Sequence, residues 1–226
     1  MKIIAIILAR GGSKGIPKKN IKLINDIPLI AYTIKQCFLA GIKEIYTSSD
    51  DHQILSIAKS YGSKEILRPS ELASSTSTSE EAWIHAIKEI SSIDYEKDWI
   101  FAPQITSPLR EPEDIKNACN LAATEKHDSI LSVVAFDDFF LWENKNKKVT
   151  PINHDFKFRK RRQDIETKTL LENGSFYMFK PKGIIKENNR LHGNIGCVFM
   201  EKYKMFQIDE EEDLALAEYF INKHHL

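Results

Sequence analysis

The sequence predicts an α/β fold with a mostly parallel sheet flanked by helices, and three observations carry this prediction. Residues 3–9 form a continuous apolar run, which is typical of a parallel strand buried on both faces. Strand and helix patterns then alternate up to residue 135, as they do in α/β proteins. The length of 226 residues, with 28% charged and 42% hydrophobic residues, suits a single globular domain.

The expected elements follow the first strand at short intervals. Apolar residues at helical spacing, ended by Gly41, predict a helix over 28–40, and first-turn acids after Pro112 predict another. At the start of the last helix, Asp209 with Glu212 is a candidate N-cap. The other expectations are strands at 44–48, 65–67, 98–102, 129–135 and 205–208, and helices at 51–60, after 79 and at 210–222.

The alternation of strand and helix breaks between Phe136 and Lys180. This stretch contains several aromatic residues, the cationic run 157–162 and a turn-forming Glu172-Asn-Gly sequence. We therefore expect one domain over residues 1–226, with an inserted arm at about 137–180.

The charge balance limits the classes of partner. Lys plus Arg and Asp plus Glu both number 32, so the formal net charge is zero. A general nucleic-acid binder or a polybasic membrane binder would need a basic excess. The N-terminal apolar run is too short to cross a membrane, and the three cysteines lack disulfide or zinc spacing. We expect a soluble, cytoplasmic protein with neither a nucleic-acid nor a membrane partner.

The loop after the first strand, residues 10–20, is the strongest functional signal. It contains three glycines and four cations (Arg10, Lys14, Lys18 and Lys19) without an acidic residue. Backbone N–H groups and cations in such a loop suit a nucleoside triphosphate and a leaving pyrophosphate. The loop matches neither the Walker P-loop nor the dinucleotide fingerprint, and a solvated basic turn is the alternative.

Residues 8–20, LARGGSKGIPKKN, resemble the signature loop of the acylneuraminate cytidylyltransferase (CMP-sialic acid synthetase) family. Further segments are similar in order and spacing: 67–73, 104–110, 161–164 with 173–174, and 209–214. The resemblance covers nearly the whole chain and is looser at 136–158 and 182–205. It implies a Rossmann-like nucleotidyltransferase fold whose inserted arm makes a homodimer.

The resemblance also implies a reaction. CMP would pass from CTP to the anomeric hydroxyl of a sialic-acid-like nonulosonic acid, pyrophosphate would leave, and Mg²⁺ would assist. Two alternatives stay open: a nucleotidyltransferase of the same fold with another acceptor, such as 3-deoxy-octulosonic acid or a sugar phosphate, and a non-catalytic nucleotide-binding domain.

Individual residues take roles from the same resemblance. The implied catalytic residues are Arg10, Lys19 and Asp209, and Asp209 is also the implied metal ligand. The implied nucleotide-binding residues are Leu8, Ala9, Arg10, Gly12, Ser13, Lys14, Lys19, Asn20, Arg68, Ser77 and Ser79. The implied sugar-binding residues are Gln104, Arg162, Gln163, Asn173 and Tyr177.

Two positions have competing interpretations. Ser79 could contact the base, but either Ser79 or Thr78, with Glu81, could instead cap the following helix. The family usually has a second Asp two residues before Asp209, where this chain has Gln207. One carboxylate is chemically adequate, because Mg²⁺ commonly combines one or two carboxylates with substrate phosphates.

Overall fold

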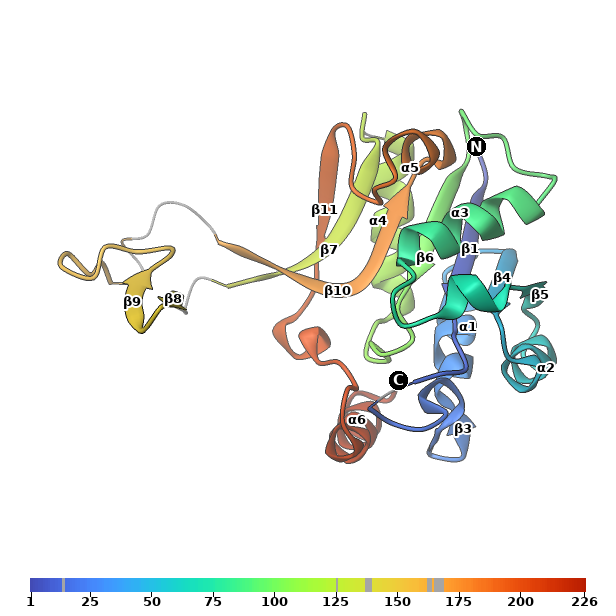
Figure 1. Ribbon diagram of the computed structural model, residues 1–226, viewed down its shortest axis with the longest axis horizontal. Helices are drawn as coiled ribbons and strands as arrows, with labels where there is room; N and C mark the ends of the chain where they lie inside the picture. The colour runs from blue at the N-terminus through green and yellow to red at the C-terminus, as the bar shows by residue number, and fades with distance from the viewer. Residues whose placement is uncertain (14, 125, 137–139, 162–163, 165–168) are drawn as a thin grey trace.

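The computed structural model describes residues 1–13, 15–124, 126–136, 140–161, 164 and 169–226 (Figure 1). Its central sheet has seven strands in the order β11-β7-β10-β6-β1-β4-β5. All neighbouring pairs are parallel except those of β10, which is antiparallel to both β6 and β7. The predicted α/β fold with a mostly parallel sheet is therefore confirmed. The strands are β1 (Ile3–Leu8), β4 (Glu44–Ser49), β5 (Lys64–Leu67), β6 (Trp99–Pro103), β7 (Ser129–Ala135), β10 (Leu170–Phe179) and β11 (Ile195–Phe199).

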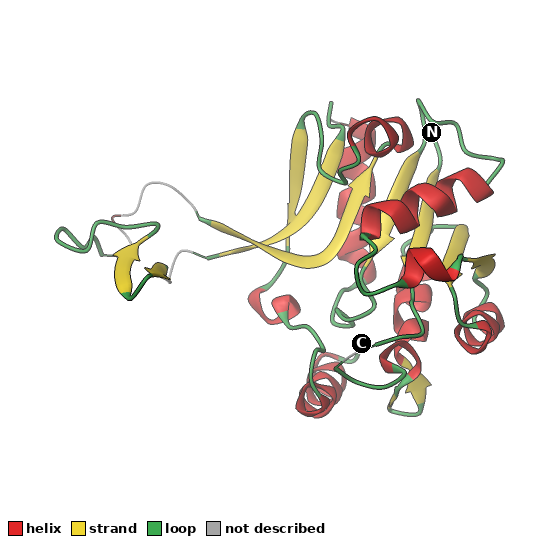
Figure 2. Cartoon of the chain, in the orientation of Figure 1, coloured by secondary structure: helices red, strands yellow, loops and turns green. Residues whose placement is uncertain are grey.

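Helices cover both faces of this sheet (Figure 2). The continuous apolarity of β1 explains why, since Ile4 and Ile6 are buried on one face while Ala5 and Ile7 are buried on the other. Helices α3 (Ser79–Glu89) and α5 (Pro181–Glu187) pack on the first face. The second face is covered by α1 (Leu29–Leu39), α2 (His52–Ser60), α4 (Pro112–Thr124) and α6 (Glu211–His224).

The structure differs from the sequence prediction in several places. Residues 205–208 are not a strand: the 3₁₀ helix η4 (Lys202–Met205) ends there, and an irregular segment continues to α6. The N-cap of α6 is Glu210, paired with Asp213, rather than Asp209. Strands β10 and β11 and helix α5 were not predicted.

The arm is a small hairpin that lies away from the main sheet. Strands β8 (Trp142–Lys145) and β9 (Lys148–Pro151) pair antiparallel, and the outer parts of β7 and β10 extend toward them as a ribbon (Figure 1). The range expected for the arm, about 137–180, thus also contains β10, which belongs to the central sheet. No helix among the described residues is long and apolar enough to cross a membrane.

A buried lysine fixes the segment that precedes α6. The side chain of Lys204 is only 2% exposed, and its Nζ lies 2.8 Å from Glu111, 3.0 Å from Asp114 and 2.6 Å from Glu201. Burial raises the pKa of Asp114, although the hydrogen bond from Lys204 acts in the opposite direction. The cluster therefore holds η4 against the start of α4 through ion pairs, in which each buried charge is stabilised by a partner of opposite charge.

Replacing Lys204 with Met should lower the free energy of unfolding by about 3–5 kcal/mol, because the Asp114 carboxylate would stay buried without its cation. Burial already gives this carboxyl a raised folded-state pKa, so its ionised form opposes folding. The deficit should accordingly shrink as the pH falls and Asp114 takes up a proton. Urea unfolding at pH 7 and pH 5 measures both effects. Lys59→Met, which removes an exposed pair with Glu65, is the control and should leave the midpoint unchanged.

Candidate active site

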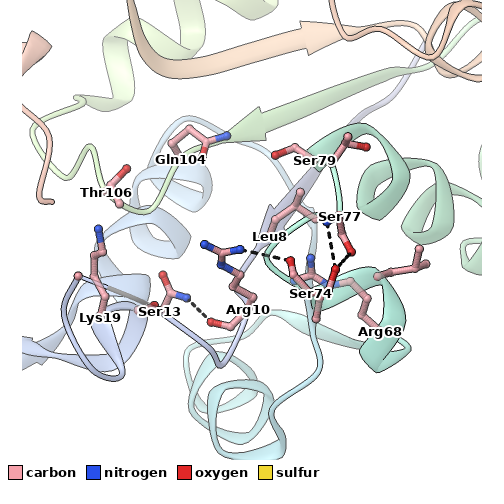
Figure 3. A pocket seen from close by; sticks show the side chains of 15 residues that line it. Leu8, Arg10, Ser13, Lys19, Arg68, Ser74, Ser77, Ser79, Gln104 and Thr106 are labelled. Atoms are coloured by element: carbon pink, nitrogen blue, oxygen red, sulfur yellow. Dashed lines mark hydrogen bonds between the residues drawn. The ribbon is translucent and has the colours of Figure 1, made fainter.

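A polar cavity lies where three strands of the central sheet end. Leu8 ends β1, Arg68 follows β5 and Gln104 follows β6, and all three residues line a cavity of about 400 Å³ (Figure 3). Ligands of open α/β sheets bind at the carboxyl ends of the strands. The remaining lining residues are Arg10, Ser13, Gly15, Lys19, Asn20, Leu72, Ala73, Ser74, Ser77, Thr78, Ser79 and Thr106.

The glycine-rich loop forms one wall of the cavity, and backbone contacts hold it in place. The Asn20 side chain donates to the carbonyl of Arg10 at 3.0 Å, and the N–H of Gly11 donates to Asp50 at 2.9 Å. A Cβ on Gly15 would lie 2.6 Å from the backbone oxygen of Asp209. Glycine is therefore needed at residue 15 for the loop to approach the segment before α6 so closely.

The cations of the loop do not share one direction. Arg10 extends along the cavity, with its Nη1 3.4 Å from the backbone oxygen of Ser74, and Lys19 lies at the other side (Figure 3). Lys18 instead donates to Gln53 on α2 at 2.9 Å and does not line the cavity. Lys14 lies outside the described residues. Two loop cations, rather than four, are thus shown facing the space for a ligand.

Arg68 adds a third, largely buried cation. It is 5% exposed, and its Nη2 donates to the backbone oxygen of Ser48 at 2.9 Å. Burial lowers the pKa of this guanidinium, while the nearby Asp50 partly compensates. A guanidinium remains charged under these conditions, so Arg68 gives the cavity floor a fixed positive charge.

Lys19 joins the loop to Asp209. Its Nζ donates to the backbone oxygen of Ile208 at 2.8 Å and to the Asp209 carboxylate at 3.1 Å. The Asp209 side chain is 72% exposed, so it is accessible to a ligand beside the loop. Among the described residues there is no group of three or more acidic, histidine or cysteine side chains that could hold a metal.

A hydroxyl-rich run before α3, residues 74–79, forms the wall of the cavity opposite the glycine-rich loop. Thr78 is the N-cap of α3, and its side chain and that of Glu81 form a reciprocal capping box. This settles the capping alternative in favour of Thr78 and leaves the Ser79 hydroxyl beside the cavity. The Ser77 hydroxyl already uses its hydrogen within the protein, since it donates to the backbone oxygen of Glu71 at 2.7 Å.

Gln104 is positioned by the backbone of β10. Its N–H donates to the carbonyl of Ser175 at 2.9 Å, and the same carbonyl accepts from Arg110 Nη1 at 2.7 Å. Arg110 is fully buried and also donates to Thr33 on α1. The side chain at the cavity is therefore held indirectly by a buried guanidinium that links two layers of the fold.

Several residues proposed from the sequence lie elsewhere. Asn173 is buried and accepts hydrogen bonds from Ser132 and from the N–H of Ser175. Tyr177 is also buried, donates its hydroxyl to Glu172 and packs against Trp83. Neither Asn173 nor Tyr177 is among the described residues that line the cavity, and neither is Ala9 or Gly12. Arg162 and Gln163 lie outside the described residues.

Sequence reasoning missed part of the cavity lining. Gly15, Leu72, Ala73, Ser74, Thr78 and Thr106 line it but were not singled out as ligand-binding residues. Four of them fall inside segments named above: Gly15 in the glycine-rich loop, Leu72 and Ala73 in residues 67–73, and Thr106 in residues 104–110. Ser74 and Thr78 belong to the hydroxyl-rich run 74–79, of which Ser77 and Ser79 were named as nucleotide-binding. These segments therefore line the cavity, although the sequence alone did not indicate which of their side chains face it.

With this geometry known, comparison with other proteins identifies the family. The sequence matches the family model described as cytidylyltransferase over residues 4–223. The chain belongs to the cytidylyltransferase family. Its Arg10 and Lys19 therefore line a cavity in a member of this family.

Two relatives and one solved structure show how far this family likeness extends. N-acylneuraminate cytidylyltransferase A of Danio rerio is 34% identical over 96% of this chain, which spans about half the length of that protein. The pseudaminic acid cytidylyltransferase of Campylobacter jejuni is 30% identical over 100% of this chain and 98% of its own length. The structure of CMP:2-keto-3-deoxy-manno-octonic acid synthetase complexed with CTP covers 99% of this chain and 100% of its own, with a TM-score of 0.72 and 12% identity, and so shares the fold.

The two neighbouring hydroxyls at the start of α3 should separate on mutation. Thr78→Ala should lower the free energy of unfolding by about 1 kcal/mol through loss of the capping box. Ser79→Ala should leave unfolding unchanged and weaken CTP binding, because its hydroxyl faces the cavity. Urea unfolding and calorimetric titration with CTP distinguish them. Equal effects of the two variants on both measurements would contradict the assignment.

Proposed function

We propose that this member of the cytidylyltransferase family transfers CMP from CTP to the anomeric hydroxyl of a sialic-acid-like nonulosonic acid and releases pyrophosphate. The observation that carries the proposal is a cavity at the strand ends with Arg10, Lys19 and Arg68 around it and Asp209 beside it. The names of the relatives from Danio rerio and Campylobacter jejuni support a nonulosonic acid as the acceptor.

The cations account for the nucleotide half of the reaction. The acceptor hydroxyl gives up its proton to water, and its oxygen forms a bond to the α-phosphorus. The bond from that phosphorus to the oxygen bridging to the β-phosphorus breaks, and its electron pair leaves with pyrophosphate. Negative charge therefore increases on the leaving group, and fixed cations stabilise it more than they stabilise the ground state. Arg10 and Lys19 supply the stabilising positive charge from the loop. The Ser79 hydroxyl on the opposite wall is available to contact the cytosine base.

The site residues fit a Mg²⁺ ion that is held largely by the substrate. Asp209 offers one accessible carboxylate beside the loop, and Gln207 replaces the second acid. Mg²⁺ prefers oxygen ligands and retains waters and phosphates, so one protein carboxylate suffices. When bound, the ion would neutralise phosphate charge, and Asp209 would hold it next to Lys19.

The acceptor side of the proposed site begins at Gln104. Its side chain lines the cavity across from the loop, so an acceptor next to it would face the α-phosphate of a nucleotide held by Arg10 and Lys19. Arg162 remains the proposed partner of the sugar carboxylate, since a guanidinium fork suits a carboxylate. Gln163 joins Arg162 in the proposed sugar-binding set, whereas the buried Asn173 and Tyr177 are proposed to support this set without contacting the sugar.

The direct experiment is pyrophosphate release from CTP and Mg²⁺ with a panel of acceptors: sialic, legionaminic, pseudaminic and 3-deoxy-octulosonic acids. Release with one or more nonulosonic acids is the expected result. Release with 3-deoxy-octulosonic acid alone would overturn the acceptor class. If none of the four acids gives pyrophosphate release while CTP still binds, the proposed activity is overturned and a non-catalytic nucleotide-binding role is favoured.

Arg10→Ala and Asp209→Ala should each reduce kcat by about 10²–10³ without lowering the unfolding midpoint, because each removes one electrostatic stabiliser of the transition state. Lys18→Gln is the matched control, since Lys18 is a cation of the same loop that contacts Gln53 instead of the cavity. Steady-state kinetics with the active acceptor provide the measurement. Wild-type rates for Arg10→Ala, or an equal loss for Lys18→Gln, would contradict the assignment.

We further propose that the protein is a homodimer formed through the arm. The described part of the arm exposes large apolar side chains, which need a partner surface: Leu141, Trp142, Val149, Ile152, Phe156 and Phe158. Sedimentation velocity should give a dimer at micromolar concentration, and Trp142→Ser with Phe158→Ser should shift it toward monomer. A wild-type monomer would contradict this proposal. The cytoplasmic location stays a prediction.

A further inference from the structure

Gln207 lies between the two halves of the proposed site and uses its amide as a donor. Its Nε2 lies 2.7 Å from the backbone oxygen of Asn173 on β10. A carbonyl oxygen can only accept, so the nitrogen of the amide must face it. The neighbouring Gly174 has φ +65°, and a Cβ there would lie 2.7 Å from the same Nε2. The contact therefore needs both the amide at 207 and the missing side chain at 174.

On one side, this contact reaches the backbone that holds Gln104. Asn173 turns its side chain inward, where Oδ1 accepts from Ser132 at 2.6 Å and from the N–H of Ser175 at 3.2 Å. The carbonyl of Ser175 then accepts the N–H of Gln104 at 2.9 Å. The irregular part of β10 between Glu172 and Tyr177 is thus a rigid support for the acceptor side.

On the other side, the contact reaches the segment that carries Asp209. The next residue, Ile208, donates its N–H to Thr106 at 2.8 Å and accepts Lys19 Nζ at 2.8 Å. Lys204 fixes the start of the same segment on α4. Residues 205–209 lie between these two anchors. Among the described residues, the Gln207 amide makes the side-chain hydrogen bond that joins this segment to β10.

We propose that Gln207 is a positioning residue that sets the Asp209–Lys19 side of the site at a fixed distance from the Gln104 side. An acidic residue at this position could not do so, because an ionised carboxylate has no hydrogen to donate and would repel the Asn173 oxygen. The role rests on the proposed function, in which the acceptor beside Gln104 attacks a nucleotide held beside Lys19. Misplacement of reacting groups by about 1 Å can cost about 10²-fold in rate.

The test replaces Gln207 with Glu, which has the same shape without the donor. We expect kcat/KM for the acceptor to fall at least about 10-fold while the Kd for CTP changes less than about twofold, since only the relative position of the two halves is disturbed. Gln53→Glu is the matched control: it makes the same charge change at an exposed glutamine that accepts from Lys18, and it should behave as wild type. Wild-type acceptor kinetics for Gln207→Glu would overturn the proposal. Faster turnover of Gln207→Glu, reached at a lower Mg²⁺ concentration than in the wild type, would also overturn the proposal, because the residue at position 207 would then act as a metal ligand.

A double-mutant cycle tests the contact itself. Gly174→Ala should impair acceptor kinetics, because its methyl group would displace the Gln207 amide. In a Gln207→Ala background the same change should do less, since the amide that it displaces is gone. Fully additive effects of the two substitutions on kcat/KM would overturn the proposed coupling between residues 174 and 207.

Hydrogen–deuterium exchange separates this proposal from the proposed function. In the unliganded protein, Gln207→Glu should speed amide exchange in peptides covering 103–107 and 173–177 without changing peptides from α2. This readout needs no substrate. Absence of turnover in the wild type would overturn the proposed function alone, whereas unchanged exchange in both peptides would overturn the role of Gln207.

Discussion

The ammonium group of Lys19 is the contact on which the proposed site depends. It joins the glycine-rich loop to Ile208 and Asp209, nearly two hundred residues further along the chain. The loop contains cations and no acids between residues 10 and 20, so its counter-charge must come from elsewhere in the fold. Gly15 makes the approach possible, because any side chain there would collide with the Asp209 backbone. The loop that forms one cavity wall is therefore held in place by a segment near the other end of the sequence.

The sheet supplies the frame for this closure. Strands β5, β1 and β6 end at the same edge, which brings Arg68, Arg10 and Gln104 to one cavity from three distant segments. Buried polar groups behind the edge then hold the side chains in place: Arg110 and Asn173 fix the Ser175 backbone, and Lys204 fixes the segment before α6. A net charge of zero is thus the sum of separated clusters, which suits a small anionic ligand as the proposed substrate.

The sequence was informative where local patterns decide the structure. A continuous apolar run can only be a doubly buried strand or a helix segment, and the glycines after it fixed its end. The strand predicted at 205–208 does not form, because the N–H of Ile208 bonds to Thr106 and the Gln207 side chain to Asn173 as single contacts instead of a ladder. Strand β10 was missed because its Asn-Gly pair, typical of a turn, forms an irregularity inside the strand with φ +65° at Gly174. Asp209 does not cap α6 because its side chain pairs with Lys19, and Glu210 takes that position. These outcomes depend on partners far along the chain, which no local pattern contains.

We propose that the cavity between the glycine-rich loop and the start of α3 holds CTP with its phosphates toward Lys19. A crystal structure of the protein soaked with CTP and Mg²⁺ tests it most directly. We expect triphosphate oxygens within hydrogen-bond distance of Arg10 and Lys19, the cytosine against the wall that carries Ser79, and a metal ligated by Asp209. CTP bound outside this cavity, or with its phosphates beside Ser79 and its base beside Lys19, would contradict it.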